Sequence, residues 1–207
     1  MESHIETPLE VALANADRPQ ATPLSVFKMA RTNWLEGKRI SIGELAKEAG
    51  VSRVTLYRWV GSKDRLTEEV LWSFAKPTFE NAIKGSPGNG VEHIVGVHHQ
   101  FLTDLANFIP FRRFVIENPT VAISIQTNDP KSAHGRLMRV VEAHLKAQQS
   151  QGHIKLHSPA RKIAEMIVFT NGALLYSAII GDRASTAIEH ACALIRMTLL
   201  DQIPDAH

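Results

Sequence analysis

The fold is decided by residues 41–65, which read SIGELAKEAGVSRVTLYRWVGSKDR. The tetrapeptide Ser-Ile-Gly-Glu that begins at Ser41 is a capping box, which is typical of the start of a helix. Gly50 can adopt the left-handed backbone conformation that a tight turn requires. Ser52 then caps another short helix, which reaches about Val60 before a glycine follows. This stretch therefore predicts two short helices joined by a tight turn.

The second of these helices has a polar outer side. Apolar residues are spaced to form one small core, at Leu45, Val51, Leu56 and Val60. The residues left on the outer side are Arg53, Val54, Thr55, Tyr57 and Arg58. This is the arrangement of a helix-turn-helix, whose second helix enters the major groove of DNA. Arginine suits guanine edges, and valine and threonine methyls can contact thymine methyls. The alternative is a helical hairpin that only packs.

Phosphate contacts are expected around the same two helices. Tyr57 and Lys63 can reach phosphates, and so can the backbone N–H groups of the helices that begin at Ser41 and Ser62. Charge agrees with this: residues 1–19 carry −3, residues 20–76 carry +4 and the remainder carries +1, for a net charge of +2. A basic segment in a nearly neutral chain indicates a phosphate-binding surface, although a solvated helix face would look the same.

The rest of the chain also has helical periodicity, so the fold class is all-α. Thr22-Pro23 opens a helix that runs to about Glu36, and Ser62 caps a helix that Pro77 must kink or end. Further helices are expected at about 91–107, 110–117, 120–127, 131–150, 159–180 and 184–201. We therefore expect an N-terminal extension at 1–21, a three-helix helix-turn-helix domain at 22–66 and a larger ligand-binding and dimerisation bundle at 67–207.

Residues 22–72 resemble the DNA-binding domain of TetR-family transcriptional regulators. The resemblance lies in Gly50-Val51-Ser52, in Thr55-Leu56-Tyr57 and in the Ser62-Lys63 pair that opens the next helix. The chain departs from the family at Trp59, where His or Tyr is usual, and at Val60, where Phe is common. The run LYRWVGSKDRLTEEVLW, residues 56–72, resembles the QsdR-type subgroup, whose members resemble regulators of lactone or quorum-signal breakdown genes.

The resemblance implies a ligand-responsive regulator, most simply a repressor that binds a near-palindromic operator as a homodimer. Its DNA-binding residues would be Ser41, Ser52, Arg53, Val54, Thr55, Tyr57, Arg58, Trp59 and Lys63. Its last two long helices, at about 159–180 and 184–201, would pair with those of the second subunit. The first of these is apolar nearly all round, so it must be covered from several sides. A central helix of a monomeric bundle would satisfy the same pattern.

The helices between the helix-turn-helix domain and the last two long helices would form the pocket of a small amphipathic effector. The ligand-binding candidates are His98, Phe101, Phe111, Phe114, Met138, Phe169, Asn171 and Tyr176. The subgroup resemblance implies a lactone or an acyl-chain compound as the effector. For any single phenylalanine, packing in the core is the competing explanation, and for any single histidine a surface or capping role is.

Several other classes of protein are disfavoured. The first twenty residues lack a secretory signal, and Glu165 and Asn171 interrupt the longest apolar stretch, so we expect a cytoplasmic protein outside the membrane. The single cysteine, Cys192, fits packing, and no enzyme motif, cofactor fingerprint or metal-ligand set is recognisable. The alternatives that stay open are an effector-independent regulator or activator and, further off, a helical enzyme or interaction protein.

Overall fold

The computed structural model describes residues 7, 21–125, 129, 131–181 and 183–200, and these form helices and connecting loops without a strand. The all-α prediction is confirmed. The helices are α2 (Pro23–Leu35), α3 (Ile42–Glu48), α4 (Arg53–Val60), α5 (Lys63–Gly85), α6 (Gly90–Asn107), α7 (Ile109–Glu117), α8 (Pro119–Ser124), α9 (Ala133–Ser150), α10 (Ala160–Ile180) and α11 (Ala184–Leu200). Apart from Thr7 and Ala21, the predicted N-terminal extension lies outside the described residues.

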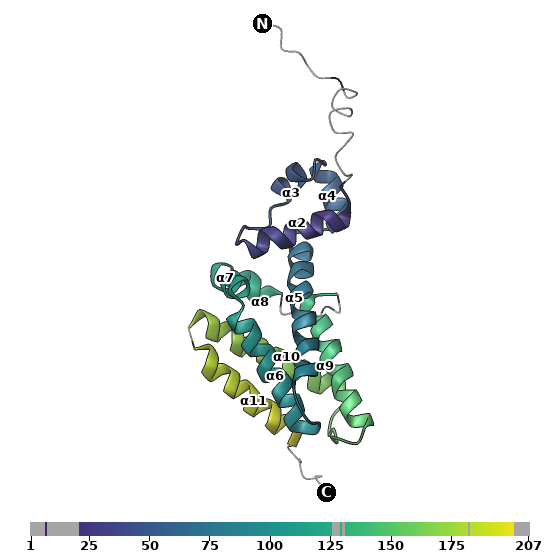
Figure 1. Cartoon of the computed structure of the whole chain (residues 1–207), viewed down its shortest axis with the longest axis vertical. Coiled ribbons are helices and arrows are strands. Elements are labelled where there is room, and N and C mark those ends of the chain that lie inside the picture. The colour runs from purple at the N-terminus through teal and green to yellow at the C-terminus, as the bar shows by residue number, and fades with distance from the viewer. Residues whose placement is uncertain (1–6, 8–20, 126–128, 130, 182, 201–207) are drawn as a thin grey trace.

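Helices α2, α3 and α4 form a small unit at one end of the molecule (Figure 1). The turn between α3 and α4 has the expected geometry, because Gly50 lies in the left-handed region at φ 67°. Leu45 and Leu56 are buried together with Ala46, whose small side chain allows α3 and α4 to pack closely. Trp34, at the end of α2, is also buried. The predicted helix-turn-helix core is therefore present.

Helix α5 connects this unit to the rest of the chain. Of the two outcomes expected at Pro77, a kink or an end of the helix, the end does not occur, because α5 continues through Pro77 to Gly85. Proline removes one N–H donor from the helix interior, but Pro77 is exposed, so its ring does not disturb the core. Beyond it, Phe79 and Ala82 are fully buried and hold the last turns of α5 in place. The expected domain boundary at residues 66 and 67 falls inside this continuous helix.

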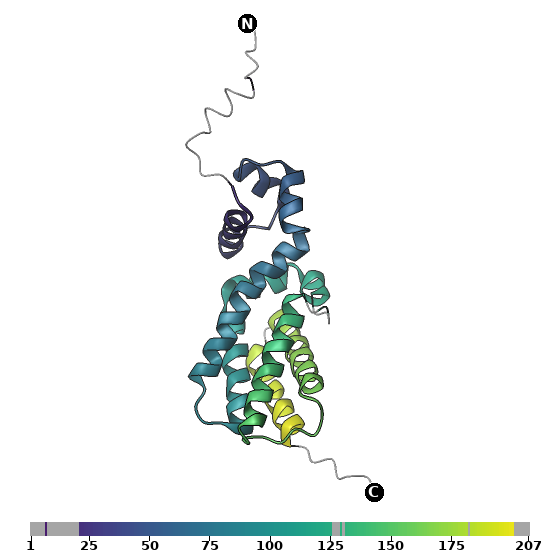
Figure 2. The same ribbon diagram turned by 90° about the vertical axis from the view of Figure 1, so that its right-hand side faces the viewer.

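Helices α6 to α11 form a bundle into which α5 extends from the small unit (Figures 1 and 2). Helix α6 packs against α5, α7 and α11, while α10 packs against α6, α7, α9 and α11. Two bidentate ion pairs join elements far apart in the sequence: Arg196 of α11 contacts Glu92 of α6, and Arg136 of α9 contacts Glu69 of α5. Helix α10 therefore packs against four other helices while one of its sides stays exposed.

By length and composition alone, α10 is the one described helix that could cross a membrane. Its position in the bundle gives another reason for its apolar sequence, since Ile163, Ile167 and Leu175 are buried against neighbouring helices. Asn171, in the middle of α10, is buried and hydrogen-bonded to His98 of α6. This pair is a protein-interior contact, as expected of a core helix.

The uninterrupted path of α5 yields a stability prediction. Pro77→Ala restores a backbone N–H at an exposed helix position, where it can donate a hydrogen bond to the carbonyl of Ser73. The free energy of unfolding of the variant should therefore be higher by about 1–3 kcal/mol. Urea denaturation followed by circular dichroism measures this. The control is Pro87→Ala in the loop between α5 and α6, which should bring no gain. A Pro77→Ala variant less stable than the natural chain would show that α5 needs the local geometry that proline imposes.

Candidate DNA-binding surface and ligand cavity

The outer face of α4 is open to solvent. Ser52 caps the helix by accepting a hydrogen bond from the backbone N–H of Thr55 at 3.0 Å, and the two hydroxyl oxygens are 2.9 Å apart. Val54 is 79% exposed and Tyr57 is 50% exposed, although a folded protein usually buries side chains of this kind. The α4 face, defined as Arg53, Val54, Tyr57 and Arg58, is thus available for contact with another molecule.

Arg53 of the α4 face also contacts α3, and the other predicted DNA-binding residues differ in their exposure. The guanidinium group of Arg53 lies against Gly43 of α3, in space that a side chain there would fill. Ser41 caps α3 through the N–H of Glu44, and Lys63 is exposed in the first turn of α5. Thr55 is partly buried and its hydroxyl takes part in the cap of α4. Trp59 differs from the others, because it is partly buried and packs against the apolar core.

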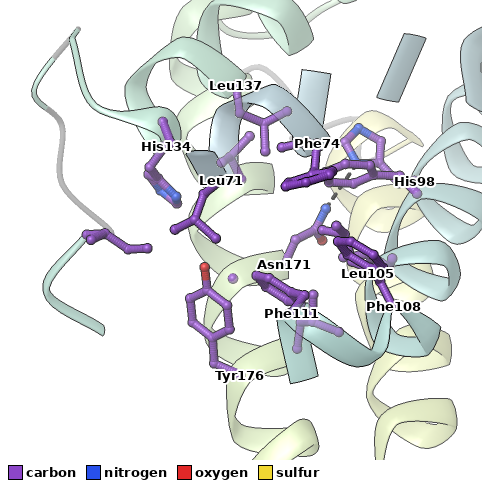
Figure 3. Close-up of a pocket in the computed structure, with 18 of the residues that line it drawn as sticks. Leu71, Phe74, His98, Leu105, Phe108, Phe111, His134, Leu137, Asn171 and Tyr176 are labelled. Carbon is purple, nitrogen blue, oxygen red and sulfur yellow. Dashed lines mark hydrogen bonds between the residues drawn. The ribbon is translucent and has the colours of Figure 1, made fainter. Parts of the chain in front are cut away.

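A cavity lies within the bundle, lined by α5, α6, α7, α9 and α10 and by the end of α2 (Figure 3). Its volume is about 90 Å³, several times the roughly 10–15 Å³ that one water molecule occupies on this measure. The walls are mainly leucine and aromatic side chains, with His98, His134, Asn171 and Tyr176 as the larger polar groups. No Asp, Glu, Lys or Arg is among the described residues that line it.

The eight predicted ligand-binding residues divide into two groups. Those that line the cavity are His98, Phe101, Phe111, Asn171 and Tyr176. Phe114 is buried beside Trp34 and lines a different crevice, between α7 and the α2–α3 connection. Met138 is buried outside the cavity, and Phe169 contacts the ring of His134, which is itself a lining residue. Helical periodicity places all eight in the bundle but does not determine which side of each helix meets the empty space.

The polar groups of the cavity are uncharged. The Asn171 amide nitrogen lies 3.0 Å from His98 Nδ1, and burial lowers the pKa of His98 to about 3. Burial also lowers the pKa of His134 to about 4, while desolvation raises the pKa of Tyr176 to about 12. Both imidazoles and the phenol are therefore neutral near pH 7. His98 Nε2, His134 Nε2 and Asn171 Oδ1 are buried without a hydrogen-bond partner.

Sequence reasoning missed the contribution of the helix-turn-helix unit to the cavity. Trp34, on α2, is a lining residue. Its ring stacks on Phe74 of α5 with centroids 5.3 Å apart and lies 5.9 Å from Phe108 and 6.3 Å from Phe114 of α7. We call these four residues the aromatic junction. Their apolar character could be read from the sequence, but their meeting depends on how α2 docks on α5 and α7.

A second contact joins the same parts of the molecule. Gly37, just after α2, has φ 83°, and the guanidinium group of Arg113 of α7 fills the space that a side chain at Gly37 would need. Arg31 of α2 lies over the ring of Phe74 and donates a hydrogen bond from Nε to the hydroxyl of Ser73. Helix α2 and the turn after it are thus held to α5 and α7 by Arg31 and Arg113 as well as by the aromatic junction.

Other kinds of site find little support in the described part of the chain. No group of three or more His, Cys, Asp or Glu side chains there could hold a metal ion. Cys192 is buried in α11, and desolvation raises the pKa of its thiol, which leaves it in the poorly nucleophilic protonated form. The exposed α4 face and the uncharged cavity are therefore the two features that need a function.

An exposed helix-turn-helix on a helical bundle with an internal cavity defines a class, the ligand-binding transcriptional regulators. Residues 89–200 match the family model described as "Tetracyclin repressor-like, C-terminal domain", which is more than half of the chain. The chain belongs to the TetR family. Members of this family are DNA-binding transcriptional regulators and not enzymes. A search of curated proteins finds no match.

Solved structures agree with this assignment. The R. erythropolis transcriptional repressor QsdR, from the TetR family, is 25% identical, with a TM-score of 0.79 over 89% of this chain and 97% of that one. A TetR-family regulator from Pectobacterium atrosepticum is 15% identical, with a TM-score of 0.62 over 95% and 99% of the two chains. FadR from Bacillus subtilis, solved in complex with stearoyl-CoA, is 14% identical, with a TM-score of 0.56 over 86% and 98%. The predicted family resemblance is confirmed, and the last two likenesses concern the fold alone.

The neutral state of His98 has a measurable consequence. Its pKa is about 3 in the folded protein, against 6.5 for an unperturbed histidine. As the pH falls below about 6.5, the His98 side chain takes up a proton in the unfolded chain but not in the folded one. The free energy of unfolding therefore decreases from about pH 6.5 down to about pH 3. The contribution of one such histidine to the slope is at most about 1.4 kcal/mol per pH unit.

His98→Asn should consequently flatten the dependence of the unfolding free energy on pH between about 6 and 4.5, even if the variant is less stable at pH 7. Urea titrations at several pH values give that slope. The control is Gln149→Asn, an exposed position without an ionisable group, whose replacement should leave the slope unchanged. Equal slopes for the natural chain and His98→Asn would contradict a buried, neutral imidazole.

Proposed function

We propose that the chain is a cytoplasmic, ligand-responsive transcriptional repressor that binds a near-palindromic operator as a homodimer and is released by a small amphipathic effector. One observation carries the proposal: the unit that exposes the α4 face also contributes Trp34 to the wall of the cavity. DNA contact and effector contact can therefore influence each other through a single packed helix, α2.

In this proposal α4 enters the major groove. Arg53, Val54 and Thr55 contact base edges from its first turn, and Arg58 lies one turn further on the exposed side. Tyr57 and Lys63 contact phosphates, as do the backbone N–H groups at the capped starts of α3 and α5 near Ser41 and Ser62. The partly buried Trp59 packs against the apolar core and can donate a hydrogen bond from its single side-chain N–H to a phosphate. What supports these roles is the exposure of the face and the positive charge around it.

The homodimer would form through α10 and α11. Both helices bury one side in the bundle and leave apolar side chains on the other, where Met166 is 53%, Ile180 is 52%, Leu194 is 43% and Met197 is 61% exposed. On α10, the exposed residues Met166, Ala173 and Ile180 recur every seventh position and so form one stripe. Large exposed apolar side chains gathered on adjacent helices favour an isologous contact with a second copy. Such a dimer presents two α4 helices to half-sites about 34–36 Å apart.

Release would follow from a population shift. An effector in the cavity touches Trp34, Phe74 and Phe108 and so favours the docking of α2 that accommodates it best. If that docking places the two α4 helices at a different separation, the effector favours a form of the protein that binds the operator less well. The shift between the two forms cannot exceed the difference between the effector's affinities for them. The resemblance to the QsdR-type subgroup makes lactones and acyl-chain compounds the first effectors to examine.

The DNA-binding roles can be tested with two variants on one duplex. The duplex is selected from a random library with the full-length protein, and binding is followed by fluorescence anisotropy at two salt concentrations. Arg53→Ala should lose about 1–3 kcal/mol on the selected duplex and lose preference over a scrambled one. Lys63→Ala should weaken binding to both duplexes alike and lower the salt slope by about one.

Three results would count against this assignment of roles. The first is that selection enriches no duplex, and the second is that the natural chain loses binding to both duplexes equally at the higher salt. The third is that the two variants show identical losses on both duplexes. The first two outcomes would contradict specific DNA recognition itself. The third would contradict only the division between base and phosphate contacts.

The dimer surface gives a separate prediction. Met166→Glu combined with Met197→Glu places four carboxylates in the proposed interface, so the dissociation constant of the dimer should rise by at least about tenfold for each position. Analytical ultracentrifugation gives the constant directly. Gln149→Glu, an exposed change of the same charge on α9, is the control and should not affect assembly. A double variant that assembles like the natural chain would place the interface elsewhere.

A further inference from the structure

The cavity contains an unusual pair of polar residues. His98 is 1% exposed and Asn171 is 5% exposed, and both line the cavity from adjacent helices, α6 and α10. Their side chains bond to each other, with the Asn171 amide nitrogen 3.0 Å from His98 Nδ1. One further atom of each residue, His98 Nε2 and Asn171 Oδ1, is buried without a partner. Buried polar atoms are rarely left unpaired, because each lost hydrogen bond is costly.

The hydrogen-bonding roles of these two free atoms can be worked out. The amide N–H of Asn171 donates to His98 Nδ1, so the imidazole proton lies on Nε2. His98 then offers a donor and Asn171 Oδ1 offers an acceptor. The opposite amide orientation would exchange the two roles and still leave one donor and one acceptor. The pair therefore matches a ligand group that itself combines one acceptor with one donor.

Charge narrows the ligand further. The described residues around the cavity include no Lys or Arg to balance an anion and no Asp or Glu to balance a cation. His98 and His134 are both neutral near pH 7, because burial lowers the pKa of each. An ion transferred into such a space would lose its hydration without gaining a counter-charge. Aromatic and leucine side chains cover the rest of the wall and suit an apolar body (Figure 3).

We propose that the effector is an uncharged secondary amide with apolar substituents, whose carbonyl oxygen and N–H are bound by the free donor and acceptor of the His98–Asn171 pair. The inference rests on the proposed function, since it specifies the ligand of the same cavity. It excludes free fatty acids and other anions as the molecules that this site is built to bind. An ester or a lactone without an N–H group satisfies only one half of the pair.

Four probes of equal heavy-atom number separate these possibilities. N-propylbutanamide has both hydrogen-bonding groups, propyl butanoate and butyl propyl ketone have the carbonyl alone, and heptanoate carries a charge. Titrations followed by ligand-observed NMR on the full-length protein give the four dissociation constants. The amide should bind about tenfold more tightly than the ester and the ketone, and heptanoate should bind most weakly.

The contribution of the pair is tested with Asn171→Leu, which keeps the approximate size but removes both amide functions. It should bring the amide and the ketone to equal affinity while the ketone itself still binds. The matched control is Phe101→Leu, a cavity-lining change that should weaken all uncharged probes by similar factors and keep the preference for the amide. If Asn171→Leu does not fold, Asn171→Ala provides the second test, because it also removes both amide functions and should bring the amide and the ketone to equal affinity.

Every outcome separates this inference from the proposed function. Heptanoate binding as tightly as the amide, equal binding of the amide and the ketone, or absence of binding by all four probes would overturn the inference. A preference for the amide that persists in Asn171→Leu would overturn the role of the pair. In each of these cases, specific binding to the selected duplex would leave the proposed regulator intact, whereas its loss would count against the regulator instead.

Discussion

The proposed connection between the cavity and the DNA-binding unit depends on the stacking of Trp34 on Phe74. Phe108 and Phe114 pack alongside these two rings. These rings bring together α2, α5 and α7, the elements through which the helix-turn-helix unit meets the bundle. Because aromatic side chains bury large areas and prefer particular ring geometries, they fix the docking of α2 more tightly than aliphatic contacts would. Three of the four, Trp34, Phe74 and Phe108, also form part of the cavity wall. A change in what the cavity contains therefore acts on the residues that hold the DNA-binding unit.

Charge is distributed in a way that suits two different ligands. The α4 face and the start of α5 carry Arg53, Arg58 and Lys63 in the open, where attraction to phosphate is strong and depends on salt. The described wall of the cavity has no formal charge, and burial keeps its histidines neutral. Electrostatics thus directs a polyanion to one end of the molecule and excludes ions from the other. The only connection between the two regions that the account requires is mechanical, through α2.

The fold could be predicted largely from the sequence, because its signals are local. Helix caps such as Ser52 and Ser62, the turn glycine Gly50 and the spacing of apolar residues each act within a few positions of the chain. At Pro77 the local signals left either a kink or an end of the helix open, and the burial of Phe79 and Ala82 accounts for the continuation of α5. The outward residues of α4 could be predicted for the same local reason. The cavity could be predicted only in part. Periodicity identifies His98 and Asn171 as inward residues. It cannot show that Trp34 lines the cavity while Met138 and Phe169 do not.

Whether the contents of the cavity control DNA binding through α2 can be tested without knowing the effector. Leu137 of α9 lines the cavity, and Leu137→Trp would place a large side chain in the space that the effector is proposed to occupy. The measurement is the affinity of this variant for the selected duplex, with folding checked by its thermal unfolding. We expect Leu137→Trp to lose affinity for the duplex by about 5–150-fold, the usual range of coupling between two sites. A folded Leu137→Trp variant that binds the duplex as tightly as the natural chain would contradict it.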